Sequence, residues 1–217
     1  MGGIWEMNAW ELIMAGGPIM VPILFCSFFA FGIVIEKLVY FGSININISE
    51  LKKQIFELIK SNNIKEAVQL CDQQRSPVAK ILRAGLIRYG SSRDAIKESM
   101  EEVSLYEIPK LESRLGALVT IAHLSPLLGL LGTVTGLTGC FHTIKVRAAS
   151  LNPITPGDLA GGIEEALLTT VAGLLVAVPA FVTYNYLVSR TNQYVLEMER
   201  AATDLVNFMC QITETGT

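Results

Sequence analysis

The chain has 217 residues, of which 51% are hydrophobic and only 17% are charged, and its net charge is −3. Soluble domains average about 25% charged residues, and the shortfall here lies in three long uncharged runs, which indicates membrane spans. The negative balance argues against a nucleic-acid partner.

The first uncharged run predicts a membrane helix over residues 12–35, preceded by a short outward-facing segment at residues 1–11. About 20 apolar residues in a helix cross a hydrocarbon core of about 30 Å. Backbone groups in lipid must be hydrogen-bonded within the helix, so Pro18 and Pro22 are expected to act only as kinks. Lys37 closes the run, and we expect its charged end to reach the headgroups.

Residues 36–114 are predicted to form a cytoplasmic loop of amphipathic helices, with a break at residues 62–63. Ser91 with Asp94 resembles a capping box that opens the last of these helices. Only Pro109 interrupts that helix before the second uncharged run. We therefore expect the helix and the second run to form one kinked helix.

Two more membrane helices are predicted over residues 115–144 and 163–189, joined by a link at residues 145–162 that makes them antiparallel. Small side chains recur every three to four positions in both helices. Such faces let helix backbones approach closely, which is a main source of packing energy in lipid. The small residues are Gly129, Gly132, Gly136, Ala166, Thr169, Gly173 and Ala177.

Two threonines of these helices are predicted to lie at similar depths. At 1.5 Å per residue, Thr133 lies about 17 Å and Thr170 about 12 Å from the outer ends of their helices. The alternative is that each hydroxyl only bonds to its own helix. Glu165, at the outer mouth of the third run, is a candidate functional residue because ionisable groups are costly at a membrane edge. Glu164 is explained more simply by solvent and the helix dipole.

The tail at residues 190–217 is predicted to continue the third membrane helix. From Leu187 to Ile212 apolar residues alternate by four and three, which is a heptad seam. The pattern leaves open whether this seam packs against the loop helices of its own chain or against neighbouring subunits.

The positions of Lys and Arg predict the orientation, because cytoplasmic loops are enriched in these residues. The 36–114 loop holds thirteen of the 17 basic residues, and the tail and the 145–162 link hold two each. Three crossings place the loop and the tail on one side, which is expected to be the cytoplasm. The N-terminus and the link then face outward.

Catalytic and metal-binding motifs are not visible in the sequence. The four cysteines form no CxxC or Cys/His cluster. The glycine-rich stretch GLLGTVTGLTG lacks the GK[ST] ending of a phosphate loop and lies inside a predicted span. His123 and His142 could shuttle protons, although polar tips at the headgroups explain them more simply. We expect neither an enzyme nor a cofactor.

Several motifs resemble the signature of the MotA/TolQ/ExbB proton-channel family. The second run contains PLLGLLGTVTG from Pro126 to Gly136, and the third contains GIEEALLTTVAGL from Gly162 to Leu174, followed by AVPA and YN. The opening WELIMAGGP is also similar to ExbB and TolQ chains. Three crossings fit the ExbB or TolQ type, since MotA chains have four.

The resemblance implies an all-α integral membrane protein of the bacterial inner membrane, assembled as a homopentamer around a central pore. The pore would enclose single-span partners of the ExbD/TolR type. A membrane aspartate of the partner would carry protons past Thr133 and Thr170, with Glu165 accepting or gating protons and the small faces lining the pore. Proton flow would drive work on TonB for nutrient uptake, or on TolA in a TolQ-type system.

Three alternatives remain at this point. A passive scaffold would only stabilise a partner in the membrane lipid. A solute transporter would call for internal repeats and broken helices at the midplane, which the sequence does not show. A sodium-driven motor would share the architecture and differ in the ion.

Overall fold

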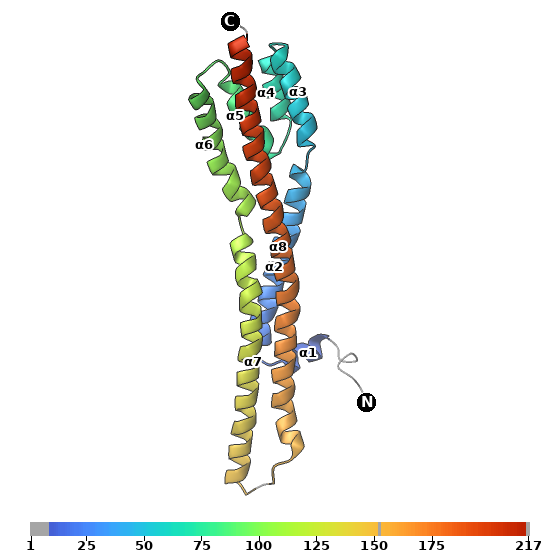
Figure 1. Ribbon diagram of the computed structural model, residues 1–217. Coiled ribbons are helices and arrows are strands. Elements are labelled where there is room, and N and C mark those ends of the chain that lie inside the picture. The colour runs from blue at the N-terminus through green and yellow to red at the C-terminus, as the bar shows by residue number, and fades with distance from the viewer. Residues whose placement is uncertain (1–8, 152, 216–217) are drawn as a thin grey trace. The chain divides into compact units, whose positions relative to one another are not determined.

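The computed structural model describes residues 9–151 and 153–215, and it is all-helical within them. These residues form the helices α1 (Ala9–Ala15), α2 (Met20–Ile44), α3 (Ile48–Lys60), α4 (Ile64–Asp72), α5 (Pro77–Ile87), α6 (Arg93–Glu112), α7 (Leu115–Ala149) and α8 (Pro156–Thr215) (Figure 1).

Three helical stretches are long and apolar enough to cross a membrane, and they lie within Met20–Lys60, Arg93–Ala149 and Pro156–Ile212. Their surfaces expose large apolar side chains, among them Phe28 on α2 and Phe141 on α7. A contiguous apolar surface of this kind is unusual on a soluble monomer. The predicted all-α architecture with three apolar helices is therefore confirmed.

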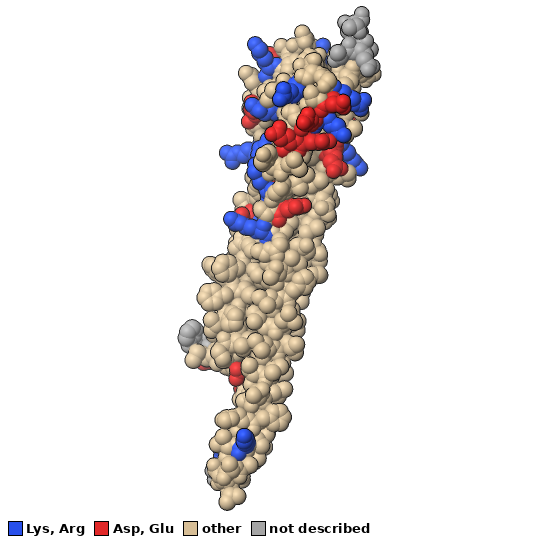
Figure 2. Space-filling view, turned by 90° about the vertical axis from the view of Figure 1, so that its left-hand side faces the viewer, with Lys and Arg blue, Asp and Glu red and all other residues tan. Residues whose placement is uncertain are grey.

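The chain divides into two compact units. Unit 1 contains the chain up to Ile35 and Arg114–Asn185, and unit 2 contains Glu36–Ser113 and Tyr186–Thr217. On the face shown in Figure 2, the apolar helices of unit 1 carry few charged side chains, whereas unit 2 carries most of the Lys, Arg, Asp and Glu side chains in view. This contrast in surface chemistry is what the sequence predicts for membrane spans and a water-exposed helical region.

The first apolar run is not one helix. Residues 16–19 separate α1 from α2, and Gly17 has a left-handed φ of 65°. The prediction of a continuous helix over residues 12–35 is wrong here, because a left-handed glycine followed by Pro18 ends the regular hydrogen bonding. Pro22 causes no break, since it lies in the first turn of α2, where a missing N–H costs nothing.

The predicted kinked helix leading into the second run is also divided. α6 passes Pro109 and ends at Glu112, and Arg114 then takes a left-handed φ of 64° before α7 begins. Left-handed backbone cannot continue a right-handed helix. The kink expected at Pro109 is therefore replaced by a break a few residues later.

The helix boundaries in unit 2 follow the local sequence signals closely. α3 ends before the predicted break at residues 62–63, and Asn62 there has a left-handed φ of 59°. The N-cap of α6 is Ser92, whose Oγ accepts a hydrogen bond of 3.3 Å from the Ala95 N–H. The capping residue predicted at Ser91 was one position early.

The core of unit 2 is built on the predicted seam of α8. Tyr194 stacks on Phe41 with ring centroids 5.7 Å apart, and Phe208 stacks on Phe56 at 4.4 Å. The seam therefore packs against helices of its own chain, which is the first of the two alternatives left open by the sequence. The most deeply buried seam residues are Leu187, Thr191, Tyr194, Met198, Ala201 and Leu205.

A buried carboxylate is held by two lysines in unit 2. Glu107 is only 4% exposed, and Lys80 Nζ donates to its Oε2 at 2.8 Å while Lys110 pairs with Oε1. Burial by itself raises the pKa of Glu107, but the hydrogen bonds and charges of the two lysines outweigh it, so the pKa lies below its ordinary value. The carboxylate therefore stays ionised at neutral pH and ties α5 to α6.

Lys37 caps the end of α6. Its side chain is 2% exposed, and Nζ donates to the carbonyl of Lys110 at 3.3 Å, the carbonyl of Leu111 at 3.0 Å and Ser113 Oγ at 3.1 Å. The last carbonyls of a helix lack intrahelical partners, and positive charge is favoured at that end. The sequence predicted that the charged end of Lys37 extends to the headgroups. Instead, its ammonium group donates hydrogen bonds to the unpaired carbonyls at the end of α6.

Replacing Lys37 by methionine should lower the free energy of unfolding by about 1–3 kcal/mol, because it leaves buried acceptors without a donor. The thermal midpoint of the detergent-solubilised protein, followed by circular dichroism, measures the change. Lys53, on α3, is exposed, and Lys53→Met is the matched control. An equal fall in both variants would contradict the capping role.

Candidate functional site

Unit 1 holds α7 and α8 in backbone contact through small residues. A Cβ built on Gly136 would lie 2.5 Å from the carbonyl oxygen of Gly162, and one built on Gly173 would lie 2.5 Å from that of Ser125. Real Cβ atoms essentially never approach other atoms so closely. Only glycine fits at these positions, so the structure confirms the close approach predicted from the small-residue faces.

The small residues face the neighbouring helix of the same chain. Thr169, for example, is fully buried, and its side chain fills the place that a Cβ on Gly132 would take. Within one subunit these residues are therefore buried in the α7–α8 contact, and only the margin of that contact is exposed. That the small faces line a pore stays a prediction. The buried residues concerned are Gly129, Gly132, Gly136, Ala166, Thr169, Gly173 and Ala177.

Thr170 and Thr133 lie at that margin, and both are partly exposed. Thr170 Oγ1 is 3.3 Å from the carbonyl oxygen of Gly129 across the contact and 3.1 Å from that of Ala166 in its own helix. Thr133 Oγ1 donates to the Leu130 carbonyl at 2.6 Å. Thr133 follows Gly129 by four residues, so the two hydroxyls are about one turn, or 6 Å, apart in level.

The link between the two helices is shorter than predicted. α7 continues to Ala149 and α8 begins at Pro156, whereas the sequence placed the link at residues 145–162. Glu165 therefore lies nine residues into α8, about 14 Å along the helix, instead of at its first turn. Arg147 pairs with Asp158 near the ends of the two helices.

Glu165 lies against the turn between α1 and α2. A Cβ built on Gly17 would overlap its Oε1 and would lie 2.6 Å from its Cδ. Thr170 follows Glu165 by five positions, which places the two side chains about 140° apart around α8. The structure thus directs Glu165 to the α1–α2 turn and Thr170 to α7, and it does not bring all three predicted residues together at one point.

Gly17 is the residue of this site that sequence reasoning missed. The two glycines before Pro18 indicate a turn. No pattern in the neighbouring sequence, however, shows that this turn contacts α8. The two histidines stay at the periphery: both are exposed, and His123 lies edge-on to Phe181 with ring centroids 5.8 Å apart.

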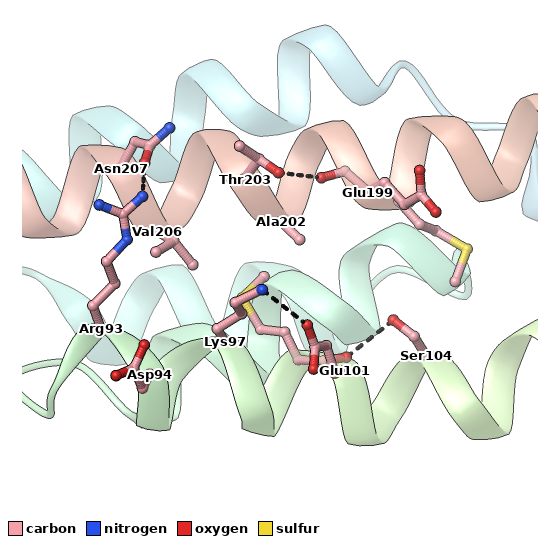
Figure 3. A pocket seen from close by; sticks show the side chains of 12 residues that line it. Arg93, Asp94, Lys97, Glu101, Ser104, Glu199, Ala202, Thr203, Val206 and Asn207 are labelled. Carbon is pink, nitrogen blue, oxygen red and sulfur yellow. Dashed lines mark hydrogen bonds and ion pairs between the residues drawn. The ribbon is translucent and has the colours of Figure 1, made fainter.

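A hollow of about 590 Å³ lies in unit 2 between α6 and the C-terminal part of α8 (Figure 3). Its wall residues bond to one another: Arg93 donates to Asn207 Oδ1 at 2.7 Å, and Lys97 pairs with Glu101 at 3.4 Å. Because these charged groups already have partners in the wall, the hollow is a weaker candidate site than the threonines and Glu165.

The chain resembles known proteins over most of its length. The family model described as the MotA/TolQ/ExbB proton channel family matches residues 73–200. A putative biopolymer transport protein ExbB homolog of Methanothermobacter thermautotrophicus is 30% identical over 190 residues, which are 87% of this chain and 66% of that protein. The putative ExbB-like protein 3 of Synechocystis is 31% identical over 172 residues, or 79% of this chain and 81% of that protein.

A third relative belongs to a different system, and a solved structure agrees in fold. The Tol-Pal system protein TolQ of Haemophilus influenzae is 40% identical over 101 residues, covering 45% of this chain and 42% of that protein. The structure of C. jejuni MotAB superposes with a TM-score of 0.60 at 18% identity, covering 94% of this chain and 82% of that chain.

Proposed function

Because the chain belongs to the MotA/TolQ/ExbB proton channel family, we propose that it is a subunit of an ExbB-type motor in the bacterial inner membrane. Five copies would surround an ExbD-type single-span partner, and proton flow would be converted into work on TonB for outer-membrane nutrient uptake. The chain would act as a channel and motor subunit and would catalyse no covalent chemistry.

One observation supports this proposal above the others. Thr133 and Thr170 place two partly exposed hydroxyls about one turn apart at the margin of the α7–α8 contact. The membrane-spanning parts of these helices otherwise expose many large apolar side chains. A hydroxyl can both donate and accept a hydrogen bond. A carboxyl group moving along this margin would meet partners in either protonation state.

The carboxyl group would come from the partner. Residues 20–35 of α2 and residues 115–144 of α7 contain no Asp or Glu, and from residue 159 to residue 189 α8 contains only Glu164 and Glu165. A proton relay through carboxyls is therefore incomplete in one chain. We propose that a membrane aspartate of the partner supplies the missing step, while Glu165 accepts or gates protons from the outer side.

The decisive experiment is proton flux in vesicles. The chain is co-expressed with an ExbD-type single-span protein, and the purified complex is reconstituted with a pH-sensitive dye inside. A potential negative inside should acidify the lumen when both proteins are present and should not do so with the chain alone. Absence of flux in the complete complex would refute the proposal, and flux that requires Na⁺ would replace it with a sodium-driven motor.

A TolQ-type role is the second candidate, and the identity with TolQ of Haemophilus influenzae favours it over unrelated functions. Cross-linking in cells separates the two, since an ExbB-type complex should capture TonB and a TolQ-type complex should capture TolA. The passive-scaffold alternative predicts that Glu165→Gln leaves the flux of the complex unchanged.

A further inference from the structure

We propose that Gly17 is a positioning residue for Glu165: the space left by its missing side chain holds the carboxylate of Glu165. The effect on proton flux rests on the proposed function. The contact between Gly17 and Glu165 does not depend on the proposed function, and it can be tested separately.

The steric argument is direct. A Cβ on Gly17 would overlap Oε1 of Glu165 and would lie 2.6 Å from Cδ and 3.2 Å from Cγ. The end of the Glu165 side chain therefore packs on the bare backbone of the turn. No residue other than glycine fits at position 17 unless the carboxylate or the turn moves.

Packing is what holds the carboxylate in place. Glu165 is partly buried, and among the residues that the structure describes its carboxylate has no hydrogen-bond or ion-pair partner. The contact with the backbone of Gly17 is therefore the interaction that limits the position of this carboxylate in the structure. A single methyl group at position 17 would change where the carboxylate sits and how exposed it is.

Gly17 also has a left-handed φ of 65°, so any substitution there adds backbone strain. The chain offers a matched control for this strain. Gly90 has a φ of 83°, but a Cβ at that position would have no neighbour within 4 Å. Gly90→Ala therefore introduces comparable strain without a collision, and Gly32→Ala, in open space within α2, introduces neither.

The test measures how readily Glu165 reacts with a hydrophobic carbodiimide in the reconstituted complex. The protonated carboxyl adds across a C=N bond of the reagent, its proton passes to nitrogen, and the adduct rearranges to an N-acylurea that mass spectrometry locates. Gly17→Ala should raise the labelling rate of Glu165 severalfold. Gly90→Ala and Gly32→Ala should leave it unchanged.

Shortening the side chain of Glu165 to that of aspartate provides a reciprocal test. Glu165→Asp alone withdraws the carboxylate from Gly17 and opens a gap, so labelling at position 165 should rise. In the double variant the added methyl group of Gly17→Ala fills that gap, and labelling should return towards the original rate. This rescue would not occur if Gly17 only stabilised the fold, and the Glu165→Asp arm remains informative if Gly17→Ala is poorly produced.

Unchanged labelling in both single variants would overturn the proposal, as would an equal rise in Gly90→Ala. Proton flux is measured on the same samples. If labelling follows the expected pattern while flux is the same in Gly17→Ala, Glu165→Gln and the original complex, the positioning contact stands and the role of Glu165 in proton transfer is refuted.

Discussion

Replacing Thr133 and Thr170 together by valine should lower proton flux through the reconstituted complex by about 10- to 100-fold. Valine keeps the volume of threonine and removes the hydroxyl. A hydrogen bond contributes about 0.5–1.5 kcal/mol, so the loss of two raises the barrier by about 1–3 kcal/mol. Each 1.4 kcal/mol on a barrier is a factor of about ten in rate. Two hydroxyls that solvate a passing carboxyl account for the range.

Thr138 on α7 provides the matched control for this experiment. It is exposed, and its Oγ1 donates to the Val134 carbonyl at 2.7 Å, which is the same kind of bond to its own helix that Thr133 makes. It lies about 140° around α7 from Thr133. Undiminished flux in the double variant, at normal complex yield, would refute the roles given to the two hydroxyls. A comparable loss in Thr138→Val would show that the effect is not specific.

Gly136→Ala should strongly destabilise the protein, whereas Gly139→Ala, three residues further along α7, should not. The Cβ at position 136 would lie 2.5 Å from the Gly162 carbonyl oxygen and 3.1 Å from the Ala166 Cβ. These are backbone and near-backbone atoms of α8, so the two helices must separate. Overpacking of a well-packed contact costs about 1–3 kcal/mol.

At Gly139 a Cβ would meet nothing within 4 Å. Alanine there should be neutral, or stabilising by up to about 1 kcal/mol through its higher helix propensity. The thermal midpoint of each detergent-solubilised variant measures the difference, and the yield of assembled complex provides a second readout. Equal midpoints for the two variants would mean that α7 and α8 are not in backbone contact.

Composition and periodicity were sufficient to predict much of the fold. The three uncharged runs correspond to the apolar parts of α2, α7 and α8. The heptad spacing after Leu187 marked the buried seam of unit 2 because burial on a helix has to repeat at helical spacing. The breaks were harder to predict. Pro109 was the visible signal before α7, yet α6 continues past it to Glu112. The left-handed residue in the break is Arg114, a residue type with no preference for that conformation.

The candidate site could be predicted only in part, because the sequence does not show which elements contact each other. A stripe of small residues shows that some helix will approach closely, but it does not say which helix. Here α8 packs on the small-residue stripe of α7, and Thr133 and Thr170 stay partly exposed at the margin of that contact. The contact between Gly17 and Glu165 joins residues far apart in the sequence, and no local pattern relates a turn near the start of the chain to a carboxylate in the last helix.

Residues 150–155 are all that separates α7 from α8, and this has a consequence for biogenesis. The two helices can pair as a hairpin as soon as both have left the insertion machinery, before a second copy of the chain is encountered. Variants at the glycine contact should therefore be degraded as newly made single subunits. Variants at Thr133 or Thr170 should accumulate normally, and their defect should appear only in the proton-flux measurement.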